Sequence, residues 1–496
     1  MSKIDLEKLK SHLWESANIL RGSIDAADYK NYIFGMLFLK RLSDVFEEEG
    51  KRIEKETGNK QLAWEERDEH EFFVPDIARW DHIKTHTQDL GTVINKANDA
   101  LEEANTATLE GVLAVTDFND KDRLPDVTLS QLITHFSKIR LRNEDLSEPD
   151  ILGRAYEYLI DQFADDAGKK GGEFYTPKEV VTLLVETLDP QEKMRICDPT
   201  CGSGGMLIQS FYHLRDIGQN PRNITLRGQE RNIGTWAICK MNILLHGLSD
   251  SRIEKGDTLR SPKLLEADGK LMTFDIVIAN PPFSLKNWGY EEAQHDPYRR
   301  FRYGIPPKGY GDYAFVQHMI ATLTVNGRAG VVMPHGVLFR AGAEGKIRKG
   351  ILEDDLLEAV IGLPSNLFFG ASIPACLFII NRDKPKVRKG KVFFLYGAND
   401  YLEGKNQNKL RKEDIEKIAS AYREYRTVEK YCRPVPLDEI RANDYNLNIT
   451  RYIDVTEEEA LIDIQQVIDE LFTLKKERTV IEEKMNSFLK ELGYKA

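Results

Sequence analysis

The sequence predicts a doubly wound α/β fold, preceded by a helical region and followed by an amphipathic helix. Three observations lead to this prediction. Residues 1–145 carry apolar side chains at helical spacing, and residues 170–382 alternate short apolar runs with helical stretches. Residues 456–496 again repeat apolar positions every three or four residues. Alternating strands and helices are typical of a mostly parallel sheet, which binds ligands beyond the carboxyl ends of its strands.

The composition is that of a folded protein with more than one domain. The chain has 496 residues, of which 41% are hydrophobic and 30% charged. No apolar run reaches about 18 residues, so no membrane span is expected. The five cysteines form no Cys-x-x-Cys pattern, and the first residues are too charged for a signal peptide. We therefore expect a reduced, cytoplasmic protein without a structural metal.

The N-terminal region is expected to be a helical domain spanning residues 1–148. Within it, the segment Asp28–Glu48 places apolar residues at three- and four-residue spacing and then ends in acidic residues. A polar stretch at Asn143–Asp150, which contains Pro149, predicts a linker or a domain boundary.

Residues 149–455 are expected to form the α/β domain. The predicted strands are short apolar runs: Arg195–Cys197, Thr225–Gln229, Phe274–Ala279, Ala329–Met333, Glu358–Leu363 and Ala375–Asn381. The predicted helices are Pro177–Leu188, Ser203–Leu214, Ile233–His246, Tyr313–Thr324 and Gly345–Glu353.

The C-terminal tail, residues 456–496, is expected to be helical. Thr456 and Glu459 form a capping box, and apolar residues then recur as far as Leu492. This pattern predicts one long amphipathic helix, or two helices that meet near Lys475–Arg478. Such a tail either packs on its own protein or docks onto a partner, and we expect docking.

A glycine-rich turn follows the first predicted strand and opens a helix. It runs from Asp198 to Gly205 and reads Asp-Pro-Thr-Cys-Gly-Ser-Gly-Gly. Glycines allow a tight turn and a close approach of a ligand to the backbone, and the Asp198 carboxylate suits a cationic amine. The turn lacks the Gly-Lys-Ser/Thr of a P-loop and departs from the Gly-x-Gly-x-x-Gly pattern. Taken alone, it is also compatible with a strand-to-helix turn that binds nothing.

Two acidic residues follow the glycine turn in an order that favours a nucleoside cofactor. Glu230 ends the second predicted strand, where a carboxylate is placed to bind both hydroxyls of a ribose. Asp257 lies beyond it and can accept a hydrogen bond from an adenine amino group. Either residue alone is equally compatible with a solvated loop.

A tetrapeptide, Asn280-Pro281-Pro282-Phe283, ends the strand Phe274–Ala279. Consecutive prolines stiffen the chain and remove backbone donors, so the Asn280 side-chain oxygen and the Pro281 carbonyl can face one point. Two acceptors at one point suit an exocyclic amine, and Phe283 offers a flat face to a flipped-out base. The alternative interpretation is a rigid apolar turn without a catalytic role. The glycine loop and the two spaced acidic residues that precede the tetrapeptide argue against it.

The order of these motifs resembles the amino-methyltransferases of the gamma arrangement, in which the cofactor motifs precede the catalytic one. Gly172–Pro177 resembles their additional cofactor motif, and Asp312-Tyr313-Ala314-Phe315 resembles their target-pocket motif. More narrowly, the chain resembles the modification (M) subunit of type I restriction–modification systems. The supporting stretches are the helical N-terminal region, Gly362–Phe368, Ile373-Pro374, Tyr445–Ile449 and Arg451-Tyr452.

This resemblance implies a Rossmann-like class I methyltransferase fold and S-adenosylmethionine (S-adenosyl-L-methionine) as the cofactor. It implies adenine-N6 methylation of DNA, with Asn280 and Pro281 orienting the amine, Phe283 stacking on the adenine and Pro282 completing the catalytic turn. No covalent intermediate is required. The implied cofactor-binding residues are Glu173, Phe174, Tyr175, Thr176, Pro177, Asp198, Thr200, Gly202, Ser203, Gly204, Glu230 and Asp257.

Net charge bears on how such a protein holds DNA. Lys plus Arg number 69 and Asp plus Glu 80, which gives a formal charge of −11 and makes strong DNA binding by the chain alone unfavourable. A basic aromatic stretch after the tetrapeptide predicts a local contact with DNA, through Arg299, Arg300, Arg302 and Lys308. No segment resembles a target-recognition domain. The resemblance implies that a specificity (S) subunit reads the sequence, with a second M subunit and a restriction (R) subunit in the full complex.

Three other functions remain open on the sequence alone. The chemistry would also serve cytosine N4, although asparagine at the first tetrapeptide position favours adenine. The chain can instead be a stand-alone DNA amino-methyltransferase that recognises its own site. A non-catalytic DNA-binding assembly protein is the third alternative, against which the intact tetrapeptide argues.

Overall fold

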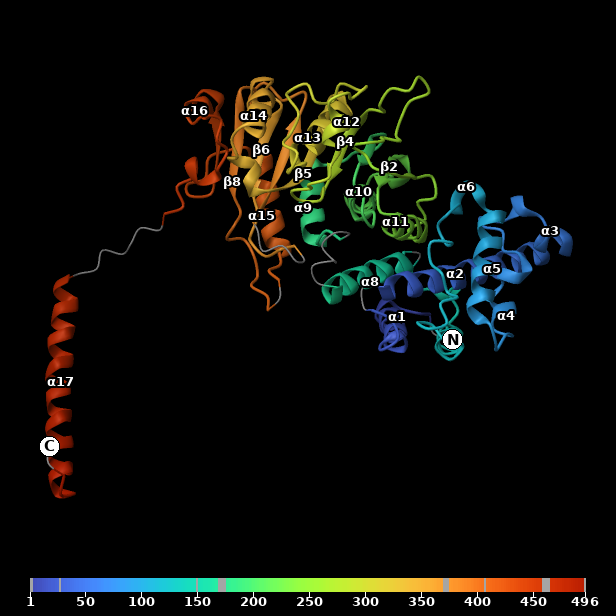
Figure 1. The fold of residues 1–496 in the computed structure, drawn as a ribbon, viewed down its shortest axis with the longest axis horizontal. Helices are drawn as coiled ribbons and strands as arrows, with labels where there is room; N and C mark the ends of the chain where they lie inside the picture. Colours follow the sequence, from blue (N-terminus) through green and yellow to red (C-terminus); the bar gives the residue numbers. More distant parts are fainter. Residues whose placement is uncertain are drawn as a thin grey trace. The chain divides into compact units, whose positions relative to one another are not determined.

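The computed structural model describes residues 3–25, 28–148, 150–167, 175–368, 374–405, 407–456 and 464–494. The chain divides into two compact units, residues 1–453 and 454–496. The second unit contains a single long helix, α17 (Ile464–Glu491), drawn in red in Figure 1. No break interrupts it near Lys475, so the one-helix alternative is confirmed. The predicted capping residue Glu459 lies outside the described residues.

The first unit begins with a helical region, as predicted. Its α-helices are α1 (Leu6–Leu20), α2 (Tyr29–Thr57), α3 (Lys60–Trp64), α4 (Trp80–Ile83), α5 (Leu90–Ala104), α6 (Thr106–Leu109), α7 (Asp126–Phe136) and α8 (Ile151–Ala167). The helix predicted at Asp28–Glu48 extends to Thr57. It ends where Gly58 adopts a left-handed conformation and its amide donates to the Glu54 carbonyl at 2.8 Å.

A nine-stranded sheet follows in the described residues, with the strand order β3-β2-β1-β4-β5-β7-β6-β8-β9. Strands β7 and β9 run antiparallel to their neighbours, and the other adjacent pairs are parallel. The strands are β1 (Arg195–Asp198), β2 (Thr225–Glu230), β3 (Arg252–Lys255), β4 (Phe274–Ala279), β5 (Leu323–Pro334), β6 (Leu357–Gly362), β7 (Ala375–Asn381), β8 (Lys391–Tyr396) and β9 (Cys432–Pro436).

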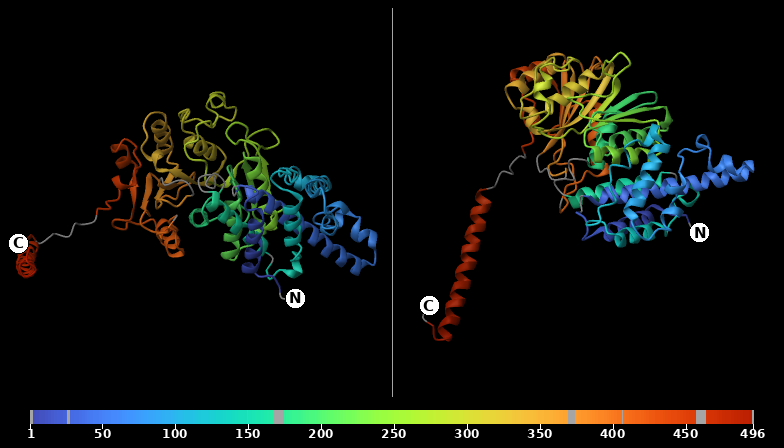
Figure 2. Two further views of the ribbon diagram at one scale, coloured as in Figure 1. Left: turned by 60° about the horizontal axis from the view of Figure 1, so that its bottom comes forward. Right: turned by 45° about the vertical axis from the view of Figure 1, so that its right-hand side comes forward.

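Helices connect these strands and cover the sheet (Figures 1 and 2). They are α9 (Lys178–Leu188), α10 (Gly205–Asp216), α11 (Ile233–Leu245), α12 (Tyr290–Ala293), α13 (Asp312–Ala321), α14 (Ala343–Glu353), α15 (Lys412–Glu424) and α16 (Leu437–Ala442). The predicted doubly wound, mostly parallel sheet is therefore confirmed, and all six predicted strands are present. Among the described residues, no helix combines the length and the apolarity required to cross a bilayer.

Three strands were not predicted. β3 and β9 are edge strands without a continuous apolar run, since β3 has Ile253 among charged residues and β9 contains Arg433 and two prolines. β8 has a clear apolar run, Val392–Leu395, and all four of these residues are buried. The sheet therefore continues beyond Asn381, the end of the last predicted strand, and β8 and β9 extend it by two strands.

Helix α8 joins the helical region to the sheet region. Its Tyr156 ring stacks on Phe34 of α2, with 3.9 Å between the ring centroids, and the Tyr156 hydroxyl donates to the Ile238 carbonyl of α11 at 3.1 Å. Gly153 of α8 faces the His246 ring so closely that a Cβ atom would lie 2.5 Å from it. Only glycine permits this approach. The helical region is thus packed directly on the helix that follows β2.

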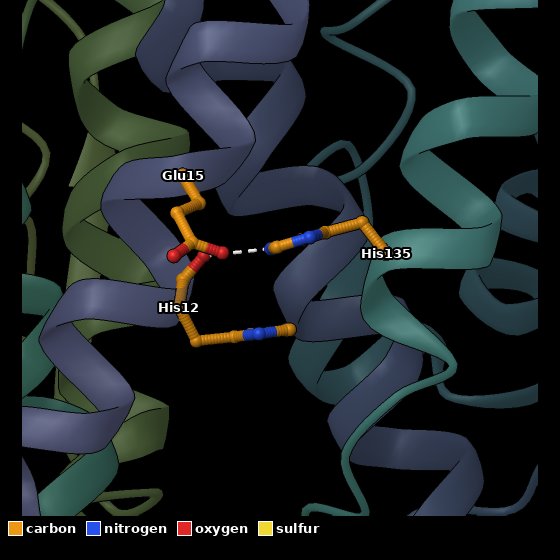
Figure 3. A group of neighbouring side chains, drawn as sticks. All are labelled: His12, Glu15 and His135. Atoms are coloured by element: carbon orange, nitrogen blue, oxygen red, sulfur yellow. Dashed lines mark hydrogen bonds between the residues drawn. The ribbon is translucent and has the colours of Figure 1, made fainter.

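The helical region contains a stacked pair of imidazoles, His12 of α1 and His135 of α7 (Figure 3). Their ring centroids are 3.9 Å apart, and His135 Nε2 donates to the His12 carbonyl at 2.7 Å. With Glu15, these residues bring possible metal-ligand atoms within 4.8 Å of one another. The nearly parallel rings do not direct their in-plane lone pairs at one point, so this arrangement is not a preformed metal site.

Candidate active site

The predicted motifs meet at one edge of the sheet. Strand β1 lies between β2 and β4 and is parallel to both. The carboxyl ends of these strands carry Asp198, Glu230 and Asn280, one per strand. Residues far apart in the chain therefore lie on adjacent strand ends, which is the edge where doubly wound sheets bind their ligands.

The glycine loop between β1 and α10 requires glycine at two positions. Gly202 and Gly204 have φ values of 53° and 87°, in the left-handed region. A Cβ atom on Gly204 would also lie 2.9 Å from the Cys239 sulfur. A residue of helix α11 also holds the loop, since the Asn242 side chain donates to the Ser203 carbonyl at 2.9 Å. This part of the chain is therefore fixed before any ligand binds.

Two carboxylates organise the loop, the buried Asp198 and the half-buried Glu230. Asp198 Oδ1 accepts the Thr200 amide at 3.0 Å, and Glu230 Oε2 accepts the Gly202 amide at 3.0 Å. The pKa of Asp198 is raised to about 8, chiefly by burial and in smaller part by the charge of Glu230, while the hydrogen bond from the Thr200 amide lowers it. Burial also raises the pKa of Glu230. Two neighbouring carboxylates with raised pKa values form a site that a positively charged ligand stabilises.

Asp257 is engaged in local structure. Its Oδ1 accepts the backbone amides of Leu259 and Arg260, each at 3.0 Å. Its Oδ2 lies 3.4 Å from the Arg231 guanidinium. Both carboxylate oxygens thus have partners, and a hydrogen bond from a bound adenine would have to be shared with them. The role of Asp257 stays a prediction.

The tetrapeptide presents one unsatisfied acceptor. Asn280 Nδ2 donates to the Thr176 hydroxyl at 2.9 Å, whereas its buried Oδ1 has no hydrogen-bond partner among the described residues. Pro281 is buried, and Phe283 is half-buried with its ring edge-to-face against Phe368 at 5.7 Å between centroids. A buried acceptor without a donor is costly, and an amine placed at this point would remove that cost.

The turn after the tetrapeptide is fixed by Asp312, the first residue of α13. Ser284 has a φ of 54°, which is unfavourable for a residue with a side chain. Its amide donates to Asp312 Oδ1 at 2.8 Å, and Asp312 Oδ2 lies 3.2 Å from the Arg340 guanidinium. Arg340 also lies 3.2 Å from Glu344, whose pKa burial raises to about 7. Asp312 therefore fixes the turn after the tetrapeptide through its hydrogen bond with the Ser284 amide.

Arg340 and Glu344 were not identified from the sequence, and no local motif marks them. The resemblance did mark Asp312-Tyr313-Ala314-Phe315, and α13 begins there as predicted. Of this segment, Tyr313 and Phe315 are core residues, 0% and 4% exposed. Asp312 is the residue of the motif that contacts the tetrapeptide turn.

The segment before α9 lies against the same site. Glu173 and Phe174 fall outside the described residues. Tyr175 is hydrogen-bonded to Asp161 of α8, and burial raises the pKa of its hydroxyl. Tyr175, Thr176, Pro177 and Ser203 line a common cavity of about 620 Å³, which α8, Gly404, Lys405 and residues 407–409 also border. The predicted cofactor motif and the glycine loop thus share one cavity.

The basic stretch after the tetrapeptide contains two kinds of residue. Arg302 and Lys308 are exposed, at 2.9 Å from Asp354 and 2.8 Å from Glu291, and Arg299 is exposed as well. Arg300 is only 4% exposed. Its guanidinium donates to Asp296 at 2.8 Å and to the carbonyls of Thr258 and Leu259 at 3.0 and 2.6 Å. The prediction of a DNA contact by Arg300 is corrected here, because these internal partners occupy its donors and the side chain is buried.

Comparison with known proteins identifies the family. Residues 147–460 match the N-6 DNA Methylase family, and residues 9–136 match the HsdM N-terminal domain. The type I restriction enzyme MjaVIII methylase subunit of Methanocaldococcus jannaschii is 35% identical over 99% of this chain and 86% of its own length. The HindI methylase subunit of Haemophilus influenzae is 35% identical over 74% of this chain and 83% of its own length.

The fold agrees with this assignment. The crystal structure of a type I restriction–modification methyltransferase subunit from Streptococcus thermophilus superposes with a TM-score of 0.80 and 31% sequence identity. The match covers 91% of this chain and 100% of that one. The resemblance drawn from the motifs is confirmed, and the chain belongs to the N6-adenine DNA methyltransferase (M) subunits of type I restriction–modification systems.

Proposed function

We propose that this chain transfers the methyl group of S-adenosylmethionine to N6 of a flipped-out adenine, with Asn280 and Pro281 as the acceptors that hold the amine. One observation carries the assignment of these residues: Asn280 Oδ1 is buried without a partner at the carboxyl edge of the sheet, while its Nδ2 is held by Thr176. An adenine N6 amine supplies the missing donor. The Pro281 carbonyl would accept its second hydrogen.

The residues present suit S-adenosylmethionine. Its ammonium group would satisfy Asp198, whose raised pKa reflects burial without a cation, and its ribose hydroxyls would bind Glu230. The loop of Thr200, Gly202, Ser203 and Gly204 would hold the methionine part, together with residues 175–177, which line the same cavity as Ser203. When bound, the cofactor supplies the electrophilic methyl of its sulfonium. Asp257 and the described part of the predicted cofactor motif belong to this proposal as secondary contacts.

The work of the chain is then positioning and electrostatics. As the amine nitrogen becomes positive in the transition state, the hydrogen bonds to Asn280 and Pro281 strengthen, which lowers the barrier. Phe283 stacks on the base and excludes water from one face. Arg299, Arg302 and Lys308 are the proposed phosphate contacts, since they are exposed on the segment that follows the catalytic turn.

We further propose that sequence recognition belongs to a separate specificity subunit, bound together with a second M subunit and, in the full complex, a restriction subunit. The formal charge of −11 supports this division, because the chain alone is poorly suited to neutralise DNA. Helix α17 is the proposed docking element for the specificity subunit. Within the described residues of its own unit the apolar residues of this helix have no covering partner, and Leu471 is 50%, Ile481 65% and Phe488 63% exposed.

The deciding experiment measures transfer of labelled methyl to DNA with and without the specificity subunit, followed by nucleoside analysis. Label in N6-methyladenine only when both proteins are present supports the whole proposal. Label with the chain alone keeps the chemistry and rejects the division of labour. Asn280→Ala should abolish transfer while cofactor binding persists, and residual transfer by this variant would reject the assignment of Asn280.

A further inference from the structure

The loop after β8 lies at the same edge of the sheet as the tetrapeptide. Because β7 is antiparallel to both β5 and β6, strands β4, β5, β6 and β8 all point the same way. The segments that follow β4, β6 and β8 therefore leave from one edge. In Figure 1 the loop after β8 is the orange segment that extends below the sheet, and it borders the same cavity as α8.

Leu402 and Lys409 close a hairpin in this loop, of which residues 402–405 and 407–409 are described. The amides of Leu402 and Lys409 donate to each other's carbonyls at 2.8 and 3.0 Å. A Cβ atom on Gly404 would lie 1.9 Å from the Gln407 carbonyl oxygen, so this turn requires glycine. The hairpin thus has a defined conformation that sets where its side chains emerge.

The hairpin is attached to the catalytic region through the loop after β6. The backbone amide of Asn408 donates to the Asn366 carbonyl, and its side chain donates to the Ser365 carbonyl, both at 2.9 Å. Phe368, three residues beyond Ser365, packs against Phe283 of the tetrapeptide. The hairpin is therefore placed in a fixed relation to the proposed target-base pocket.

Lysines of the hairpin line the 620 Å³ cavity that also contains Thr176, the hydrogen-bond partner of Asn280. Three other cations on its wall are neutralised by nearby carboxylates: Lys10 by Glu7 at 2.8 Å, Arg154 by Glu148 at 2.8 Å and Lys178 by Glu157 at 4.0 Å. No carboxylate of the described residues is within ion-pairing distance of Lys405 or Lys409. The acidic residue of the same hairpin, Glu403, does not line the cavity, so its carboxylate is not part of the wall that carries the two lysines.

We propose that Lys405 and Lys409 bind backbone phosphates of the DNA strand that carries the target adenine. This inference rests on the proposed function, since a flipped nucleotide keeps its flanking phosphates at the mouth of the pocket. Both lysines are exposed on the wall of the cavity that contains Thr176, and an ammonium on a flexible stem suits a phosphate as a point charge. Two lysines without an ion-pair partner among the described residues also supply a local basic surface, which an acidic chain needs in order to bind DNA.

The test uses the full chain assembled with its specificity subunit. We compare the wild type with the double variant Lys405→Ala/Lys409→Ala, and measure binding of a duplex carrying the target site by fluorescence anisotropy between 50 and 200 mM salt, roughly the range over which phosphate contacts dominate. The matched control is Lys386→Ala/Lys389→Ala. These two exposed lysines follow β7, which runs toward the opposite edge of the sheet.

We expect the slope of log affinity against log salt to become less steep by about 2 in the double variant, about 1 per lost phosphate contact. KM for DNA should rise and kcat should stay near the wild-type value. The control pair should leave the slope unchanged, and Lys405→Arg/Lys409→Arg should restore it.

Two outcomes would overturn the inference. An unchanged salt slope with unchanged DNA affinity shows that the hairpin does not contact phosphates. Weaker binding of S-adenosylmethionine by the isolated chain, with normal DNA affinity, shows that the lysines serve the cofactor's carboxylate instead. If the wild type methylates no DNA at all, the proposed function fails. The difference in salt slope between the wild type and the double variant still shows whether the two lysines contact phosphates.

Discussion

The Asn280 side chain donates its amide hydrogen to the Thr176 hydroxyl at 2.9 Å, and this bond decides which atom of the asparagine faces the proposed target. Thr176 precedes α9, whereas Asn280 follows β4, so the contact joins two segments that are distant in sequence. With Nδ2 held by Thr176, Oδ1 is left as an acceptor without a partner. Orientation of the catalytic amide therefore depends on a residue outside the tetrapeptide.

Replacing Thr176 with valine should lower kcat by about fivefold. Valine keeps the shape but removes the hydroxyl, so the Asn280 amide loses about 1 kcal/mol of orienting hydrogen bond. Single-turnover methyl transfer at saturating cofactor measures this effect. Thr176→Ser retains the hydroxyl and should keep most of the activity; equal losses in the two variants would mean that the hydroxyl does not orient Asn280.

Glu230→Gln should weaken binding of S-adenosylmethionine by about tenfold to a hundredfold, since hydrogen bonds to a charged group contribute roughly 1.5–3 kcal/mol. The Gly202 amide that Glu230 now holds would also lose its charged acceptor. Isothermal titration calorimetry measures the change. Glu254→Gln, on the neighbouring strand β3, is the matched control because Glu254 pairs with Arg252 instead. Equal affinities of the two variants would remove Glu230 from the cofactor site.

Cofactor affinity should increase with pH up to about 8. Burial raises the pKa of Asp198 to about 8, so at lower pH the carboxyl is protonated in the free protein and must lose its proton to bind an ammonium group. Affinity should fall by up to about tenfold per pH unit below 8 and level off above it. Calorimetry in buffers of different ionisation enthalpy reports the released proton. Asp198→Asn should bind weakly with a flat profile; a flat wild-type profile contradicts the assignment.

Asp312→Ala should reduce kcat while Asp312→Asn preserves more of it. The asparagine oxygen still accepts the Ser284 amide, whereas alanine leaves that amide and Arg340 without this partner. The loss of a buried acceptor should destabilise the turn by about 1–3 kcal/mol. Steady-state kinetics distinguishes an effect on catalysis from an effect on cofactor binding, and we expect kcat to fall with little change in cofactor affinity. Identical kinetics for the alanine variant and the wild type would exclude a supporting role for Asp312.

The His12–His135 stack should make the helical region less stable as the pH falls. Burial, and then the proximity of His135, lowers the pKa of His12 from 6.5 to about 4. The unfolded chain therefore binds more protons than the folded one between these values, and the folded state loses stability as pH falls from 6.5 toward 4. Thermal unfolding at pH 7, 6, 5 and about 4 measures this. His12→Gln cannot be protonated and should show a shallower decline; parallel declines would rule out a contribution from His12.

Much of the fold was predictable because its signals are local. The spacing of apolar residues predicted six strands between Arg195 and Asn381, as well as α2 and α17, and the structure contains them. The edge strands β3 and β9 were missed because neither contains the continuous apolar run by which a strand is recognised in a sequence. The motif residues Asp198, Glu230 and Asn280 were likewise marked by their places after predicted strands.

The sequence by itself determined the family and the order of the cofactor and catalytic motifs. Strand periodicity, the glycine turn and the tetrapeptide are all patterns of consecutive residues, so they can be recognised without the structure. Only the tertiary structure decided that Arg300 is an internal ion-pair residue, that Asp312 supports Ser284, and that Thr176 orients Asn280. These relations join residues that parallel pairing of strands brings to one edge. Burial and hydrogen-bond satisfaction at that edge depend on all the segments that meet there, and no local pattern records them.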